Sequence, residues 1–245
     1  MRVIPLLLYR DHDSFKGVGH KNHIYLGDIL NQIRILNDYK VDELTIINIE
    51  KNFNERKNLK LIKTLSLESN FAISVGGGID NFEYVKKIFD NGADKVILNS
   101  AIYNNLKLID KVSNMYGSQA VSIKLDVIKN GNDFVIYNNK KKKILGTLIT
   151  ELNKLNFSEL IISDVERDGT KIGVNKKLLN YVKNISNKLN LFSGGIKNFT
   201  EIKKLSQDEK ISGLIVGAFF SLYGNLNAPL IHYLNDYQKK QISKN

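Results

Sequence analysis

The chain of 245 residues contains no cysteine and only two prolines. Without cysteine, the chain has no disulfide, no thiolate metal site and no cysteine nucleophile, so any ammonia or acyl chemistry that needs a thiolate must occur on another protein. No stretch rich in proline, glycine or serine marks a linker, and the composition does not shift along the chain. We therefore expect a single domain over residues 1–245.

Long apolar runs are also missing. The N-terminal run from Val3 to Tyr9 contains Pro5 and is followed by the charged residues Arg10 and Asp11. It is too short for a signal-peptide core or a membrane span. We expect a cytoplasmic protein that does not associate with a membrane.

The net charge of +11 has no matching nucleic-acid signature. Nucleic-acid binding usually adds a clustered basic stripe or a known reading module, and neither is visible. The densest cluster, Lys140 to Lys143, lies in a predicted hairpin. This pattern favours a solvated lysine-rich surface; electrostatic attraction of phosphorylated ligands is the alternative.

Short runs of valine, isoleucine and leucine alternate with helical patterns along the whole sequence, which is typical of repeated βα units around a parallel sheet. Eight such units in this length predict an α/β fold, a single (β/α)₈ barrel. The expected strands are Val3–Tyr9, Glu43–Glu50, Phe71–Val75, Lys95–Asn99, Ala120–Val127, Glu159–Asp164, Leu189–Phe192 and Ser212–Val216. The expected helices cover 27–38, 57–68, 81–91, 104–116, 147–156, 175–188, 198–206 and 226–240.

A glycine-rich stretch occurs twice. Residues 74–82 (SVGGGIDNF) return, lightly edited, as residues 192–199 (FSGGIKNF), at an offset close to half the chain. The preceding strands, 43–50 and 159–166, match at nearly the same offset. We expect two half-barrels, about 1–118 and 119–240, with the glycine turns facing one another across the barrel mouth. Each turn precedes a helix, where backbone N–H groups stabilise an anion, so the repeat predicts two opposed phosphate sites.

Two segments break the regular spacing: a long first loop, Arg10 to Tyr25, and the stretch from Val127 to Leu145. Asn130-Gly131 between apolar runs predicts a hairpin in the second. Long loops on the C-terminal face of a barrel commonly cover the site. The first loop carries Lys16, a candidate phosphate ligand, although most loop lysines are exposed and idle.

Several motifs in this order resemble the cyclase subunit of imidazole glycerol phosphate synthase, over roughly residues 2 to 235. They are 75–79 (VGGGI), 92–96 (GADKV) followed by 99–101 (NSA), 117–121 (GSQAV), 167–170 (RDGT) and 193–195 (SGG). The resemblance implies a (β/α)₈ barrel whose substrate carries a phosphate at each end. We expect the following to bind phosphate or substrate: Lys16, Gly77, Gly78, Asn99, Ser100, Asp168, Gly169, Gly194, Gly195, Gly217 and Ala218.

In that family two aspartates at the ends of strands one and five perform the acid/base work. Asp126 matches the second, and the internal repeat aligns it with Leu8 at the first position. A leucine cannot exchange a proton, and losing one positioned acid or base typically costs about 10²- to 10⁴-fold in rate. Asn48 and Ala218 also stand where the family usually has aspartate and serine. Cyclase activity is therefore expected to be weak.

At the opposite, N-terminal end, the family has a ring of four charged side chains that gates ammonia arriving from a glutaminase partner. Arg2, Glu43, Lys95 and Glu159 match all four. Two cations and two anions can close as a polar plug, whereas the simpler interpretation is ordinary charge at strand starts. By resemblance we expect an ammonia gate and a glutaminase subunit docked beneath it.

In these features the chain resembles the paralogous branch of the family that is associated with glycosyl amidation. Members of that branch are thought to hand ammonia to a separate, ATP-dependent amidotransferase, which amidates a surface-polysaccharide sugar. Two alternatives stay open: a genuine cyclase of histidine biosynthesis with altered acid/base chemistry, and a non-catalytic barrel that binds phosphometabolites or activates its partner. The histidines show no metal-ligand spacing beyond Asp11-His12-Asp13 in a loop, so we expect no metal and no other cofactor.

Overall fold

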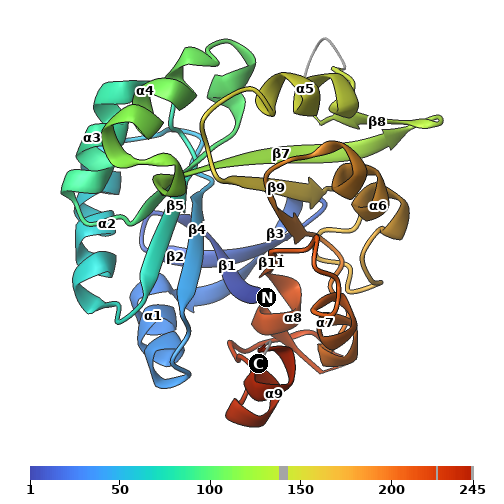
Figure 1. Cartoon of the computed structure of the whole chain (residues 1–245). Helices are drawn as coiled ribbons and strands as arrows, with labels where there is room; N and C mark the ends of the chain where they lie inside the picture. The colour runs from blue at the N-terminus through green and yellow to red at the C-terminus, as the bar shows by residue number, and fades with distance from the viewer. Residues whose placement is uncertain (138–142, 225, 244–245) are drawn as a thin grey trace.

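The computed structural model of the chain describes residues 1–137, 143–224 and 226–243. Within these residues, eight parallel strands close into a barrel in the order β11-β10-β9-β7-β6-β5-β4-β1, with β11 pairing back onto β1 (Figure 1). The predicted (β/α)₈ barrel is therefore confirmed. The barrel strands are β1 (Arg2–Arg10), β4 (Glu43–Asn48), β5 (Ala72–Gly76), β6 (Lys95–Leu98), β7 (Val121–Asn130), β9 (Glu159–Asp164), β10 (Leu189–Ser193) and β11 (Gly213–Val216).

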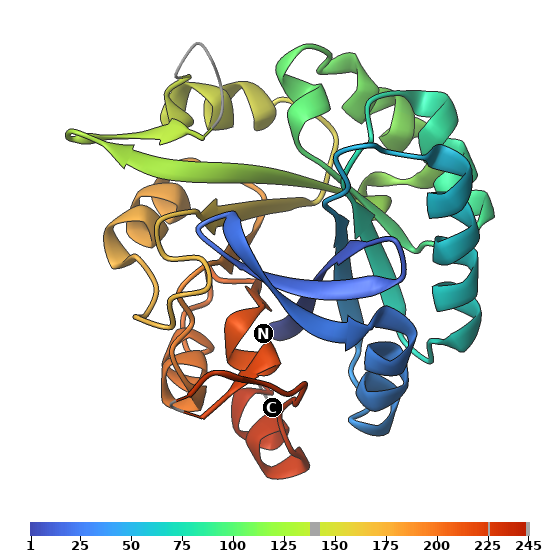
Figure 2. The same cartoon turned by 180° about the vertical axis from the view of Figure 1, so that it is seen from behind.

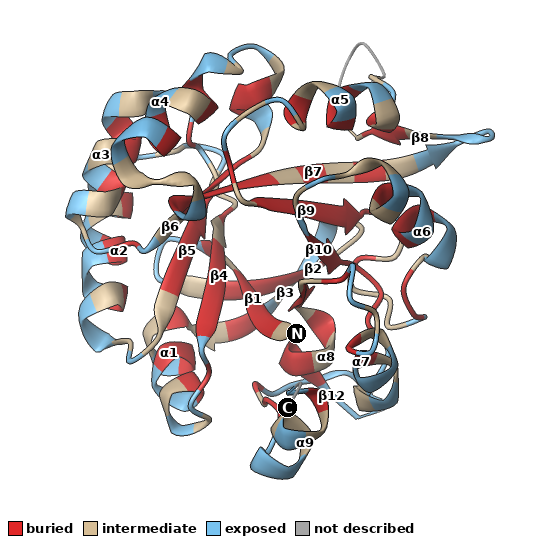
Figure 3. Ribbon diagram, viewed as in Figure 1, coloured by how far each residue is buried: buried red, intermediate tan, exposed pale blue. Residues whose placement is uncertain are grey.

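Helices surround the barrel and bury one face each against it, so exposed residues lie on the outer faces (Figure 3). The longer helices are α1 (Ile29–Asp38), α2 (Glu55–Glu68), α3 (Phe82–Asp90), α4 (Lys107–Tyr116), α5 (Leu145–Leu152), α6 (Lys176–Ile185), α7 (Phe199–Leu205) and α9 (Asp236–Ile242). Shorter helical turns are η1 (Ser100–Tyr103), η2 (Ser118–Ala120) and α8 (Ala218–Ser221).

Local capping explains where several helices begin. Asn81 and Asn198, equivalent positions of the internal repeat, each extend a side-chain oxygen to a backbone N–H in the first turn of α3 and α7. Such caps satisfy donors that the helix itself leaves free. The phenylalanine that follows each asparagine is the first residue of its helix. The repeated sequence is thus, at minimum, a strand end, a glycine turn and a helix cap used twice.

Side chains alternate along the strands, so the barrel interior receives every second residue. Six buried apolar residues from the interior form their own cluster, separate from the large core between strands and helices. Leu8 and Ile47 pack against this cluster from the C-terminal side. The six residues are Ile4, Leu6, Ile97, Ile161, Leu191 and Ile215.

Two connections differ from the expectations. The segment expected as a loop from Arg10 to Tyr25 is largely an antiparallel hairpin, β2 (Asp13–Val18) and β3 (Lys21–Asp28), which continues β1 and crosses the barrel (Figure 2). The helix expected over 226–240 is wrong for most of its length, because α9 starts only at Asp236. The chain before it forms a small ribbon, β12 (Leu222–Tyr223) and β13 (Ala228–Pro229).

The expected hairpin after Val127 is confirmed where the structure describes it. β7 runs on to Asn130 and pairs antiparallel with β8 (Asp133–Ile136). Gly131 adopts a positive φ of 60° in the connecting turn, a conformation that glycine enters without steric cost. Of the lysine cluster predicted in this region, Lys140 to Lys142 lie outside the described residues.

Candidate functional site

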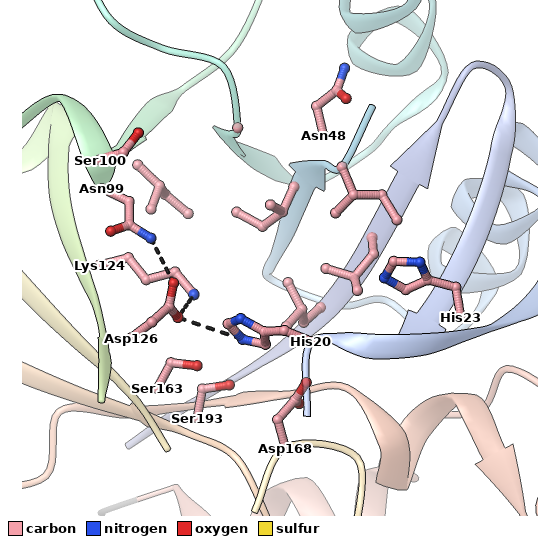
Figure 4. A pocket seen from close by; sticks show the side chains of 16 residues that line it. His20, His23, Asn48, Asn99, Ser100, Lys124, Asp126, Ser163, Asp168 and Ser193 are labelled. Carbon is pink, nitrogen blue, oxygen red and sulfur yellow. Dashed lines mark hydrogen bonds and ion pairs between the residues drawn. The ribbon is translucent and has the colours of Figure 1, made fainter. Parts of the chain in front are cut away.

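A cavity of about 370 Å³ opens at the C-terminal ends of the barrel strands. This is the face where barrel enzymes place their chemistry. Of the residues predicted from sequence, it is lined by Gly77, Asn99, Ser100, Asp126 and Asp168, and by the unusual Leu8. Residues that sequence reasoning did not single out also line it: His20, His23, Lys124, Ser163 and Ser193 (Figure 4).

Asp126 lines this cavity, and both of its carboxylate oxygens are engaged. Asn99 Nδ2 donates to Oδ2 at 2.7 Å, and Lys124, two residues earlier on the same face of β7, forms an ion pair with Oδ1. Burial by itself raises the pKa of Asp126, but the nearby charges of Lys124 and His20 and the hydrogen bonds outweigh it, so the net shift is downward. Asp126 is therefore ionised near neutral pH.

Leu8 lies in the same cavity as Asp126, as the internal repeat predicted. It pairs with Ile47 of β4 and Phe15 of β2 and is half-buried. Together with Ile47 it presents an apolar wall where a second carboxylate would stand. No acid or base is available from position 8.

Asn48 also lines the cavity and has a structural role there. Its Oδ1 accepts from the Glu50 N–H at 2.7 Å, and its Nδ2 donates to Asn58 Oδ1 at 2.8 Å. Asp164, the equivalent residue of the second half-barrel, accepts from the Glu166 N–H at 3.1 Å. Both side chains therefore close the turn that follows their strand, a function that asparagine and aspartate share.

The glycine turns lie against these same strand ends. A Cβ on Gly77 would stand 2.2 Å from the Asn48 carbonyl oxygen, and one on Gly194 would stand 2.5 Å from the Asp164 carbonyl oxygen. Both glycines have positive φ, 93° and 102°. The two half-barrels thus repeat a close backbone approach that only glycine permits.

The second glycine of each turn has different neighbours. A Cβ on Gly78 would meet the ring of Phe53 at 2.9 Å, whereas one on Gly195 would meet the Gly173 carbonyl oxygen at 2.4 Å. The remaining predicted phosphate residues lie outside the cavity lining, in the connections that follow β5, β9, β10 and β11. These are Gly78, Gly169, Gly194, Gly195, Gly217 and Ala218.

Lys16 is not on an open loop, as was expected. It belongs to β2, is 1% exposed and forms an ion pair of 2.8 Å with Asp168. The end of its side chain passes Gly217, where a Cβ would stand 3.2 Å from Cε. This places a buried cation at the C-terminal end of β11, beside the first turn of α8.

The four residues predicted as a gate form a closed ring at the opposite end of the barrel. Arg2 donates to Glu43 at 2.9 Å and to Glu159 at 2.5 Å, and Lys95 reaches the same two carboxylates at 3.1 and 2.9 Å. Ser122 donates a further hydrogen bond to Glu159 at 2.5 Å. Burial raises the pKa of Glu159, but Lys95, Ser122 and Arg2 outweigh it and lower the pKa overall.

Comparison with known proteins agrees with this architecture. The histidine biosynthesis protein family matches residues 2–227. The chain belongs to this family. A Leptospira borgpetersenii protein, provisionally named imidazole glycerol phosphate synthase subunit HisF, is 30% identical over 248 residues, covering 98% of both chains.

Other relatives fall in the same group. A Vibrio vulnificus protein provisionally named as subunit hisF3 of the same synthase is 31% identical, over 98% of this chain and 95% of its own. The imidazole glycerol phosphate synthase subunit HisF of Pelodictyon phaeoclathratiforme is 32% identical over 82% of both chains. The resemblance inferred from the motifs is thus confirmed at the level of the family.

Among the described residues, no helix combines the length and the apolar character that a membrane span requires.

Proposed function

We propose that this chain receives ammonia from a glutaminase subunit docked at the N-terminal face of the barrel, and supplies it for amidation of a surface-polysaccharide sugar. A separate, ATP-dependent sugar amidotransferase would consume the ammonia. The observation that carries the proposal is the closed ring of Arg2, Glu43, Lys95 and Glu159. All four charges face inward from strand starts and satisfy one another.

The ring and the interior behind it suit a small neutral molecule. Separating two cations from two anions opens the polar closure, and the partner's docking would supply the free energy for that separation. Beyond the ring, the interior contains apolar side chains rather than charges until Lys124 and Asp126 are reached. Neutral ammonia passes an apolar layer at low cost, whereas the ammonium ion is excluded by its desolvation penalty.

The C-terminal end supports a role other than efficient cyclisation. Leu8 presents a methyl-bearing wall opposite Asp126, and Asp126 is held as an anion by Lys124 and Asn99. The glycine turns, each with two residues at positive φ before a capped helix, support recognition of a ligand with anionic groups at both ends.

The experiment is co-expression of this chain with a glutaminase subunit from the same organism, followed by co-purification and measurement of glutamate release. We expect a stable complex in which this chain stimulates glutamine hydrolysis. Lys95→Met, which opens the ring, is expected to change the fraction of ammonia that leaks into solution. Lys86→Met serves as the matched control, because its ion pair with Glu83 lies on the exposed side of α3. Absence of a complex, or a complex with unchanged hydrolysis, removes the basis of the proposal.

A genuine cyclase of histidine biosynthesis is the second candidate, favoured by the relatives named as synthase subunits. An assay with the cyclase's bisphosphate substrate and an ammonium salt at high pH distinguishes the cyclase from the proposed ammonia-supplying subunit. We expect no imidazole product above background from the wild type, and some from Leu8→Asp, which restores a carboxylate opposite Asp126. Substantial wild-type turnover would decide for the cyclase.

A further inference from the structure

His20 is held at the barrel mouth by the docked β2–β3 hairpin. The Gly19 N–H donates to the Asp168 carbonyl oxygen at 3.0 Å, and the buried Lys16 forms its ion pair with the carboxylate of the same residue. Gly169 allows the close approach, since a Cβ there would stand 2.5 Å from the Gly17 carbonyl oxygen. The hairpin is therefore anchored through both backbone and side chain.

From this anchored turn, the imidazole points into the cavity toward Asp126 (Figure 4). His20 Nε2 lies 3.7 Å from Asp126 Oδ1, and its ring packs edge-on against Tyr137 at 5.7 Å between centroids. The Tyr137 N–H donates to the Asp126 carbonyl oxygen at 2.8 Å, so β7 and the hairpin position the two groups together. The side chain is 30% exposed, which leaves the ring accessible from the cavity.

His20 and Asp126 are suited to different tasks. Both oxygens of Asp126 accept from cationic or amide donors, and its lowered pKa leaves it little tendency to take a proton near neutrality. Burial lowers the pKa of His20; Asp126 and Asp168 oppose that shift, while Lys124 and Lys16 add to it. The net effect is a neutral imidazole at pH 7, which can accept a proton beside a fixed negative charge.

We propose that His20 is the acid/base residue of this cavity, with Asp126 as the carboxylate that stabilises its protonated form. Lys124 is the positioning residue that keeps Asp126 ionised. The hairpin thus supplies the proton-transfer group that Leu8 on β1 cannot. The substrate class is a carbonyl compound with a phosphate at each end, a point that rests on the two-anion recognition in the proposed function.

The step is a reversible proton transfer. Nε2 of the neutral imidazole takes a proton from a carbon adjacent to the carbonyl. The C–H electron pair becomes a C=C bond, and the carbonyl π pair moves to oxygen. The imidazolium returns a proton to the same carbon in the reverse direction, so no oxidant or co-reactant is required. In D₂O the imidazolium exchanges its N–H proton for deuterium from the solvent before it returns one to the carbon, so the carbon acquires deuterium.

The test uses ribulose 1,5-bisphosphate as the probe. Calorimetry measures its binding, and NMR measures deuterium uptake at the carbons next to the ketone. We expect the probe to bind and to exchange hydrogen for deuterium. The rate of this exchange should rise with pH as the imidazole deprotonates. His20→Gln should lower the rate by about 10²- to 10⁴-fold and remove that rise while the probe still binds. Asp126→Asn should shift the rise to lower pH, because the carboxylate that raises the pKa of His20 is lost.

His12→Gln is the matched control, since His12 is exposed and lies outside this cavity; it should exchange at the wild-type rate. The proposal is overturned if the bound probe takes up no deuterium, or if it takes up deuterium at the same rate with His20→Gln as with the wild type. A probe that does not bind overturns the substrate class. None of these results bears on glutaminase stimulation, which is measured at the opposite face and should be unchanged in His20→Gln.

Discussion

Glu159→Gln tests the ring of Arg2, Glu43, Lys95 and Glu159 most directly, because Glu159 is the more buried of its two carboxylates. Its side chain is 5% exposed and contacts Arg2 at 2.5 Å and Lys95 at 2.9 Å. At such separations each pair has about 6 kcal/mol of Coulomb attraction with an effective dielectric constant of about 20. Desolvation offsets much of this, and breaking a buried pair costs about 3–5 kcal/mol net.

The expected loss of stability is at the lower end of that range. The Arg2 side chain is 37% exposed, so water screens the ion pair that it forms with Glu159. We expect Glu159→Gln to lower the free energy of unfolding by about 3 kcal/mol at pH 7, which corresponds to a fall in Tm of roughly 6–12 °C. Urea denaturation followed by circular dichroism measures the first quantity and thermal melting the second.

The difference should also depend on pH. The pKa of Glu159 is lowered in the folded state, so its contribution is present above the ordinary value of 4.5 and is lost as pH falls through the folded-state pKa. The gap between wild type and variant should therefore close in acid. Glu68→Gln is the matched control, because its pair with Arg34 is 3.4 Å long with both side chains exposed, and should cost under about 1 kcal/mol. A loss in Glu159→Gln no larger than in this control, or independent of pH, would refute the reasoning.

Two further substitutions probe the other end of the barrel. Asp168→Asn leaves the buried Lys16 without its counter-charge, so we expect about 3 kcal/mol less stability and faster amide hydrogen exchange in β2 and β3; unchanged exchange would contradict the anchoring role. Gly195→Ala places a Cβ at φ 84° and 2.4 Å from the Gly173 carbonyl oxygen, which should cost about 1–3 kcal/mol in chemical denaturation. Gly131→Ala, at φ 60° in open space, is the control, and an equal cost at both sites would show that the close contact contributes nothing.

Much of the barrel could be predicted because its signals are local or periodic. Runs of β-branched residues between helical patterns located all eight barrel strands to within a few residues of their observed bounds. The internal repeat placed Leu8 in the same cavity as Asp126. Its glycines and asparagines recur as the same close contact and the same helix cap, at Gly77 and Gly194 and at Asn81 and Asn198.

The rest of the site depended on contacts between distant segments. Lys124 could have been found from strand alternation, because it shares the inward face of β7 with Asp126. His20 had no such signal: its position follows from antiparallel pairing of β2 with β1 and β3, and from the docking of that hairpin onto Asp168. The helix expected over 226–240 failed for a related reason: Ala228 and Pro229 pair with β12 as an exposed ribbon, and the extended segment that follows buries Ile231, Tyr233 and Leu234 before α9 begins.

The sequence by itself determined the fold, the half-barrel register and the absence of a carboxylate at position 8. These follow from composition and spacing along one chain, where each strand and turn carries its own pattern. Only the tertiary structure decided what faces Asp126. Lys124 and Asn99 hold that carboxylate as an anion despite its burial, and a hairpin closed across the mouth brought His20 to within 3.7 Å of it. Electrostatic and steric environments of this kind arise from residues far apart in the chain, so the pattern of any one segment does not contain them.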